Sequence, residues 1–128
     1  MSKKIDFSAE LKTKDGYVNA KLELFTFKEN GMSIVYCPAI DLSAYGKTEV
    51  EAENEFKEVF RMHISYCLAE KTLAQDLRKY GWSIKEKQKK VVSPSIEKML
   101  LSNETLKDII FNKDYTKVSR ALEIPQFA

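Results

Sequence analysis

The sequence lacks several features that would assign a protein to a class at once. It contains no apolar run long enough to span a membrane, and its formal net charge of +2 is too small to mark a nucleic-acid-binding surface by itself. Residues 1–10 carry lysines but no apolar segment of the kind found in secretion signals. We therefore expect a cytoplasmic protein without membrane contact.

Cysteine and histidine are also scarce. Cys37 and Cys67 are the two cysteines, and without an export signal both are predicted to be buried core residues instead of a disulfide. His63 is the single histidine, and the sequence places no nucleophile and orienting acid beside it, which favours a partly buried imidazole over a general base. Asp41 is the only carboxylate in residues 32–46, whereas a metal-dependent nuclease needs several that converge. The sequence predicts a non-enzymatic protein with no catalytic, metal or cofactor-binding residues.

What the sequence does contain is a strong helix signal. Thr48 is followed three residues later by Glu51, so that a hydroxyl and a carboxylate can bind two free backbone N–H groups of a helix start. No helix-breaking residue follows until about residue 69. One stripe of this helix holds Ala52, Phe56, Val59, Phe60, His63, Ile64 and Cys67. The pattern predicts a long helix packed on a sheet.

The apolar stripe widens in the second half of this helix. Met62 and Tyr66 flank it on one side and Leu68 on the other. One sheet face is too narrow to cover all of them, so we interpret these three residues as a possible partner interface.

The sheet is predicted from segments on either side of two turn signals, one at residues 14–17 and one at residues 30–31. Alternating residues predict strands at 5–11 and 18–27, the Asn30–Gly31 pair predicts a tight turn, and residues 32–37 form the returning strand. Pro38 ends that strand because it has no N–H to donate, and residues 40–45 form a further short strand or extended arm. The first 46 residues are thus expected to form an antiparallel meander.

A second, shorter helix is expected after the long one. Thr72 and Gln75 repeat the capping-box spacing, and Gly81 occupies the position of a C-terminal cap. Trp82 then starts a strand that could rejoin the sheet, followed by a lysine-rich edge or loop at 85–90.

The remaining residues suggest two short helices, at 96–101 and 104–112, and an extended piece at 118–125. The two helices have the length of a helix-turn-helix. The second, however, carries two acids, one lysine and three consecutive bulky apolar residues, which does not suit a recognition helix. We therefore expect a packed C-terminal cap, and nucleic-acid binding is the weaker alternative.

The run from residue 34 to residue 52 resembles the HicB-like antitoxin family. The family pattern combines an aromatic-containing strand, a proline, a glycine, a Thr or Ser cap and Glu-x-Glu-Ala at the helix start. The matching residues are Tyr36, Pro38, Asp41, Gly46, Thr48, Glu51 and Ala52, continued by Gly81 and Trp82. The resemblance covers residues 21–84, and Pro38, Gly46 and Thr48 within it are explained by the chain reversals they make.

This resemblance implies an α+β fold, an antiparallel three- to four-stranded sheet with one long helix on it, described for the family as a degenerate ribonuclease-H-like fold. Residues 1–90 would form this domain, and residues 91–128 a C-terminal extension that packs on the same core. Family members bind and neutralise a small RNA-cleaving HicA-type toxin and commonly form dimers, so both partners are expected here. A stand-alone, self-associating module is the alternative.

Overall fold

The computed structural model describes residues 17–85 and 90–125 of the chain. In chain order the elements are β1 (Tyr17–Glu29), β2 (Met32–Cys37), β3 (Leu42–Gly46), α1 (Glu49–Glu70), α2 (Leu73–Lys79), β4 (Ser83–Lys85), β5 (Lys90–Val92), α3 (Ile96–Leu100), α4 (Glu104–Asn112) and β6 (Tyr115–Pro125). The predicted strand at 5–11 lies outside the described residues. The described elements form an α+β fold, as expected.

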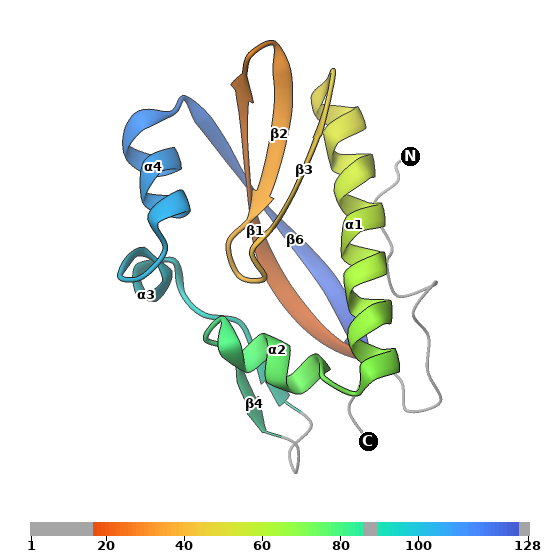
Figure 1. Cartoon of the computed structure of the whole chain (residues 1–128). Helices are drawn as coiled ribbons and strands as arrows, with labels where there is room; N and C mark the ends of the chain where they lie inside the picture. Colours follow the sequence, from red (N-terminus) through yellow and green to blue (C-terminus); the bar gives the residue numbers. More distant parts are fainter. Residues whose placement is uncertain (1–16, 86–89, 126–128) are drawn as a thin grey trace.

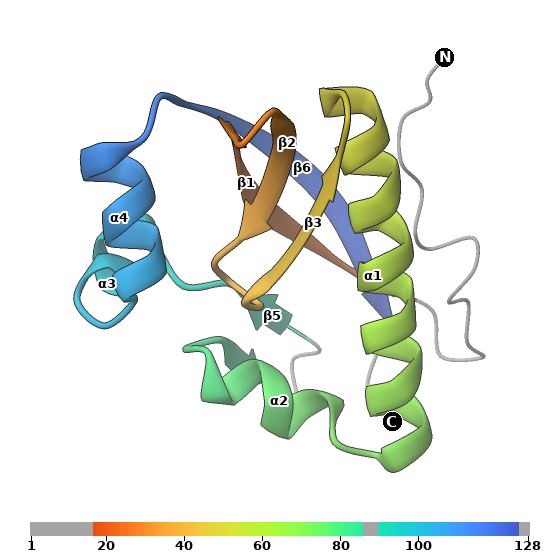
Figure 2. The same ribbon diagram turned by 45° about the horizontal axis from the view of Figure 1, so that its top comes forward.

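A four-stranded antiparallel sheet of order β3-β2-β1-β6 forms the centre of the described part of the chain. Figures 1 and 2 place α1 on one side of this sheet and α3 and α4 on the other, with α2 and the β4–β5 hairpin at one end. The predicted antiparallel sheet with a long helix on it is therefore confirmed.

The tight turn between β1 and β2 forms where the sequence predicts it. Asn30 and Gly31 both have positive φ, 54° and 79°, which is the backbone of a two-residue type I′ hairpin. This turn sets the register in which Phe25 lies opposite Tyr36 and Phe27 opposite Ile34. Because neighbours along a strand point to opposite faces, these four side chains share the face that α4 covers.

The long helix begins at its predicted cap. The Thr48 hydroxyl accepts a hydrogen bond from the Glu51 N–H at 3.1 Å, and the Glu51 carboxylate accepts one from the Lys47 N–H at 3.0 Å. Ala52, Phe56, Phe60, Ile64 and Cys67 are all buried along one stripe. A Cβ atom on Gly46 would lie 2.7 Å from the Ala52 nitrogen, so only glycine lets the end of β3 meet the first turn of α1.

Two local predictions about the segment after α1 are wrong. Thr72 makes no side-chain capping bond at the start of α2. The strand after Trp82 does not rejoin the main sheet, because β4 pairs with β5 in a separate two-stranded sheet. The place beside β1 is taken by β6, which pairs with it from Tyr17↔Pro125 to Phe27↔Tyr115.

Candidate functional site

A groove of about 490 Å³ lies at one end of the sheet. The turn between β2 and β3 forms one wall, the end of α2 a second, and the segment from Pro94 through α3 to the start of α4 a third. Pro38, Asp41, Lys79, Gly81, Lys98 and Asn103 are among its lining residues. Three residues of the predicted sequence motif, Pro38, Asp41 and Gly81, are therefore brought together here.

A hydrogen-bond network fixes the residues next to this groove. The Tyr36 hydroxyl donates to the Asp41 carboxylate at 2.8 Å and accepts from the Asn103 amide at 3.0 Å. Burial raises the pKa of Tyr36, so its hydroxyl stays protonated and keeps donating to Asp41. The Asn103 side chain also accepts from the Leu106 N–H at 2.9 Å, which caps α4. One network thus ties β2, the β2–β3 turn and α4.

Asp41 has an unusual backbone conformation in this network. Its φ of 53° is in the left-handed region, which costs free energy for a residue with a Cβ. Asp and Asn tolerate this region best, and here the hydrogen bond from Tyr36 holds the side chain in place. The strained residue lies on the wall of the groove, where backbone strain often marks a functional position.

The groove is lined by more positive than negative side chains. Arg78 and Lys79 come from the last turn of α2 and Lys98 from α3, whereas Asp41 and Glu104 are the acids. The Asp41 carboxylate already accepts the Tyr36 hydroxyl proton. The arrangement therefore favours an anionic or acidic ligand over a cationic one.

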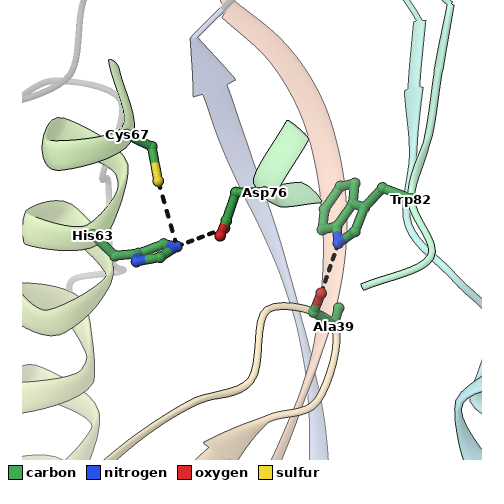
Figure 3. Close-up of polar contacts among 5 residues, drawn as sticks. All are labelled: Ala39, His63, Cys67, Asp76 and Trp82. Atoms are coloured by element: carbon green, nitrogen blue, oxygen red, sulfur yellow. Dashed lines mark hydrogen bonds and ion pairs between the residues drawn. The ribbon is translucent and has the colours of Figure 1, made fainter. Parts of the chain in front are cut away.

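Trp82 holds the β2–β3 turn, which forms one wall of the groove. It is buried, and its indole N–H donates to the Ala39 carbonyl at 2.7 Å, as Figure 3 shows. This bond joins the residue after Gly81 to the β2–β3 turn. Gly81 has φ of 99°, so it ends α2 in a conformation that other residues rarely adopt.

A second polar cluster lies where α1 and α2 meet. Nε2 of His63 is 2.7 Å from a carboxylate oxygen of Asp76 and 3.7 Å from the sulfur of Cys67 (Figure 3). His63 and Cys67 are one helical turn apart on α1, and Asp76 comes from α2. Burial, followed by the charge of Asp76, raises the pKa of the Cys67 thiol, which makes it a poor thiolate nucleophile.

Nε2 of His63 contacts a carboxylate oxygen of Asp76, as expected for a partly buried imidazole with one hydrogen-bond partner. Sequence reasoning did not find Asp76 because the partner comes from a different helix. The signals that point to it are the i, i+4 spacing of His63 and Cys67 and the chain reversal at Lys71, whose backbone is left-handed at φ 60°.

The start of α1 does not form a phosphate-binding loop, although Gly46-Lys47-Thr48 matches the end of the G-x-x-x-x-G-K-[ST] motif. Asp41 stands where that motif has its first glycine, and residues 42–46 form strand β3. The Thr48 hydroxyl is already bound to the helix N-terminus.

The residues predicted as a partner interface differ in exposure. Met62 is 60% exposed and Tyr66 65%, and they are one turn apart on α1. Leu68 is partly buried and packs against the core, so it contributes less to an exposed patch. Cys37 and Cys67 are both free and buried, and burial raises the pKa of Cys37 to about 12.

The two C-terminal helices pack against the core. Leu106 and Ile109 of α4 and Met99 of α3 are buried. A recognition helix would expose a face of base-reading side chains, whereas α4 uses its apolar face to cover the sheet. The structure therefore favours the packed cap.

Fold and groove together define a small α+β protein with a polar groove that is lined by more basic than acidic side chains. A family model described as "Cellulose biosynthesis protein BcsQ" matches residues 3–114, which is most of the chain. The chain therefore belongs to this family. Neither the curated proteins nor the solved structures contain a match to it.

This finding corrects the predicted family. The matching model is that of BcsQ, and no HicB family matches. The residues that suggested HicB-like antitoxins form a hairpin turn, a glycine contact and a helix cap, which are structural devices that unrelated proteins share. Inhibition of a HicA-type toxin stays a prediction, but the family resemblance no longer supports it.

Among the described residues, no helix is both long and apolar enough to cross a bilayer.

Proposed function

We propose that this chain is a non-enzymatic cytoplasmic component of cellulose biosynthesis that binds an acidic segment of a partner protein in its polar groove. The process comes from the description of the matching family. The observation that carries the binding mode is the groove itself, a preformed concave site whose residues are held by the Tyr36 network.

The charges of the groove support an acidic partner. Lys79 and Lys98 are exposed and line the groove from different helices, so they can contact carboxylates from two sides. Each contact at such an exposed site is worth little, about 0.2–1 kcal/mol, but several together select the sign of the partner. Pro38 and Met99 add apolar surface next to them.

Reversing the two groove lysines is expected to abolish function without unfolding the protein. In a host deleted for this gene, the Lys79→Glu, Lys98→Glu double variant should fail to restore cellulose production, because the groove would repel an acidic segment. Lys28→Glu, Lys47→Glu is the matched control, since it makes the same charge change at exposed lysines of β1 and of the turn before α1. Cellulose output and the amount of protein are measured together.

Two outcomes would contradict the proposal in different ways. If deletion of the gene leaves cellulose output unchanged, the assigned process is wrong. If the deletion reduces output but the groove variant restores it as well as the wild type does, the groove is not the binding site.

Self-association is a second candidate, favoured by the free edge of the sheet. Among the described residues, no strand pairs with the outer edge of β6, and Thr116, Lys117 and Ser119 on it are exposed. Such an edge can pair with the same edge of a second copy.

A lysine on that edge is expected to weaken a dimer. Thr116→Lys should raise the dimer dissociation constant at least about tenfold in sedimentation velocity, because charge on an edge strand opposes pairing. Asn54→Lys, an exposed site on α1, is the control. A wild type that sediments as a monomer at every concentration removes this candidate.

A further inference from the structure

The cluster of His63, Cys67 and Asp76 brings together three different metal-binding side chains. Their donor atoms lie within 4.8 Å of one another. The left-handed Lys71 ends α1, and the Thr72 N–H donates to the Cys67 carbonyl at 2.8 Å. The chain turns sharply there, and α2, which runs across the end of α1 in Figures 1 and 2, presents Asp76 to His63. The cluster is therefore a product of the helix reversal and not of chance contact between surface loops.

The contacts converge on a single atom. Both Asp76 and Cys67 approach Nε2 of His63, the nitrogen drawn between them in Figure 3. In a catalytic triad, the acid and the nucleophile bind opposite nitrogens of the imidazole, so this arrangement is not a triad. Because Nε2 makes its short hydrogen bond to Asp76, it can share at most a long contact with the Cys67 sulfur. A cation placed between the three atoms would serve all of them.

The Nε2–Sγ distance agrees with a tetrahedral zinc ion, and the Nε2–carboxylate distance needs one adjustment. Zinc–nitrogen bonds of about 2.05 Å and zinc–sulfur bonds of about 2.3 Å at a tetrahedral angle place nitrogen and sulfur about 3.6 Å apart. The Nε2–Sγ distance here is 3.7 Å. The corresponding nitrogen–oxygen separation is about 3.3 Å, whereas Nε2 and Asp76 are 2.7 Å apart in their hydrogen bond. The carboxylate would therefore move outward by about 0.6 Å as the ion replaces that bond.

We propose that His63, Cys67 and Asp76 bind one zinc ion that clips α2 to α1. Thiolate, imidazole and carboxylate are all zinc ligands, and a set that includes sulfur disfavours magnesium and calcium. Three protein ligands leave the fourth tetrahedral position to water. On binding, the thiol proton leaves to solvent, and the imidazole binds through Nε2 as the neutral tautomer that keeps its proton on Nδ1.

The partial burial of the cluster suits such a site. The side chains of His63 and Asp76 are 24% and 17% exposed, which leaves an entry path for the ion and its water. Cys67 is 3% exposed, so the sulfur lies at the inner end. Because α2 carries Arg78 and Lys79, the clip would also hold the wall of the groove, but the site is defined by its own three residues.

Cobalt titration of the tag-free full-length protein tests the site directly. Cobalt(II) added to the metal-stripped wild type is expected to give visible bands of a tetrahedral complex and a thiolate-to-cobalt band in the near ultraviolet, both saturating at one equivalent. Zinc should displace cobalt and remove both bands. His63 is the only histidine of the chain, so no second histidine site can produce the signal.

Variants assign the signal to this cluster. Cys67→Ser is expected to remove the thiolate band. Asp76→Asn is expected to weaken zinc binding at least about tenfold, because losing a ligand lowers the zinc affinity by at least as much as losing a residue that only contacts a ligand. Cys37→Ala, which removes the other thiol, should keep the bands. Asp76→Asn retains a side chain that can hydrogen-bond His63, so it tests the site even if Cys67→Ser does not fold.

Thermal unfolding supplies an independent measurement. Zinc at a hundred times its dissociation constant should increase the folding equilibrium constant of the wild type about a hundredfold relative to protein in chelator. A wild type with no thiolate band, or an Asp76→Asn variant that binds zinc as tightly as the wild type does, overturns the proposal.

Discussion

Phe56→Ala is expected to lower the free energy of unfolding by about 3–5 kcal/mol, the usual cost of emptying a large buried aromatic site. Phe56 has no exposed surface, and its ring stacks near that of Phe60 with centroids 6.3 Å apart. It lies in the middle of the α1 stripe that covers the sheet, where several elements meet and cannot all move to fill the space. Equilibrium urea unfolding followed by circular dichroism measures the change.

Val50→Ala is the matched control for Phe56→Ala. Val50 is on the same helix but is 68% exposed, so its truncation should change stability by no more than about 0.5 kcal/mol. A loss below about 1 kcal/mol for Phe56→Ala would mean that α1 does not bury this face against the sheet.

Trp82→Ala is expected to lower the free energy of unfolding by a similar amount, about 3–5 kcal/mol. The side chain is 4% exposed, and its indole N–H is the donor that the Ala39 carbonyl accepts. Truncation therefore removes packing from the α2 end of the core and also leaves a buried carbonyl without this partner. Because Trp82 is the only tryptophan, unfolding should be followed by circular dichroism instead of fluorescence.

Trp82→Phe separates the two contributions. It keeps most of the ring but cannot donate, so it should cost about 1–3 kcal/mol, the penalty of an unsatisfied buried acceptor. Tyr66→Ala, an aromatic truncation at a 65% exposed site, is the control and should lie within about 0.5 kcal/mol of the wild type. If Trp82→Ala lowers the free energy of unfolding by no more than Tyr66→Ala does, Trp82 does not hold the β2–β3 turn as described.

The parts of the fold that could be predicted are those with local causes. The Thr48 cap, the Asn30–Gly31 turn and the apolar stripe of α1 each depend on residues within a few positions of one another, and the structure has all three. The length of the sheet's second hairpin strand, Met32–Cys37, was predicted for the same reason, since Gly31 and Pro38 mark its ends.

The parts that could not be predicted depend on contacts between distant residues. An alternating pattern such as that of β6 indicates a strand but not its partner, and β6 pairs with β1 across almost the whole chain. For the same reason, the groove and the approach of Asp76 to His63 could not be found from the sequence, because each requires knowing how α2 turns. The mistaken family resemblance had the opposite cause, since it rested on local devices alone.

The pairing of β6 with β1 also determines when the protein can finish folding during its synthesis. β1 begins at Tyr17 and its partner ends at Pro125, so a nascent chain that has emerged only through α4 lacks the strand that covers one side of β1. Arg120 of that last strand also pairs with Glu53 of α1 at 2.8 Å. Contacts this far apart in sequence slow folding, because a long loop must close before they form. Until β6 has emerged from the ribosome, the open side of β1 exposes unpaired backbone groups that can associate with other chains.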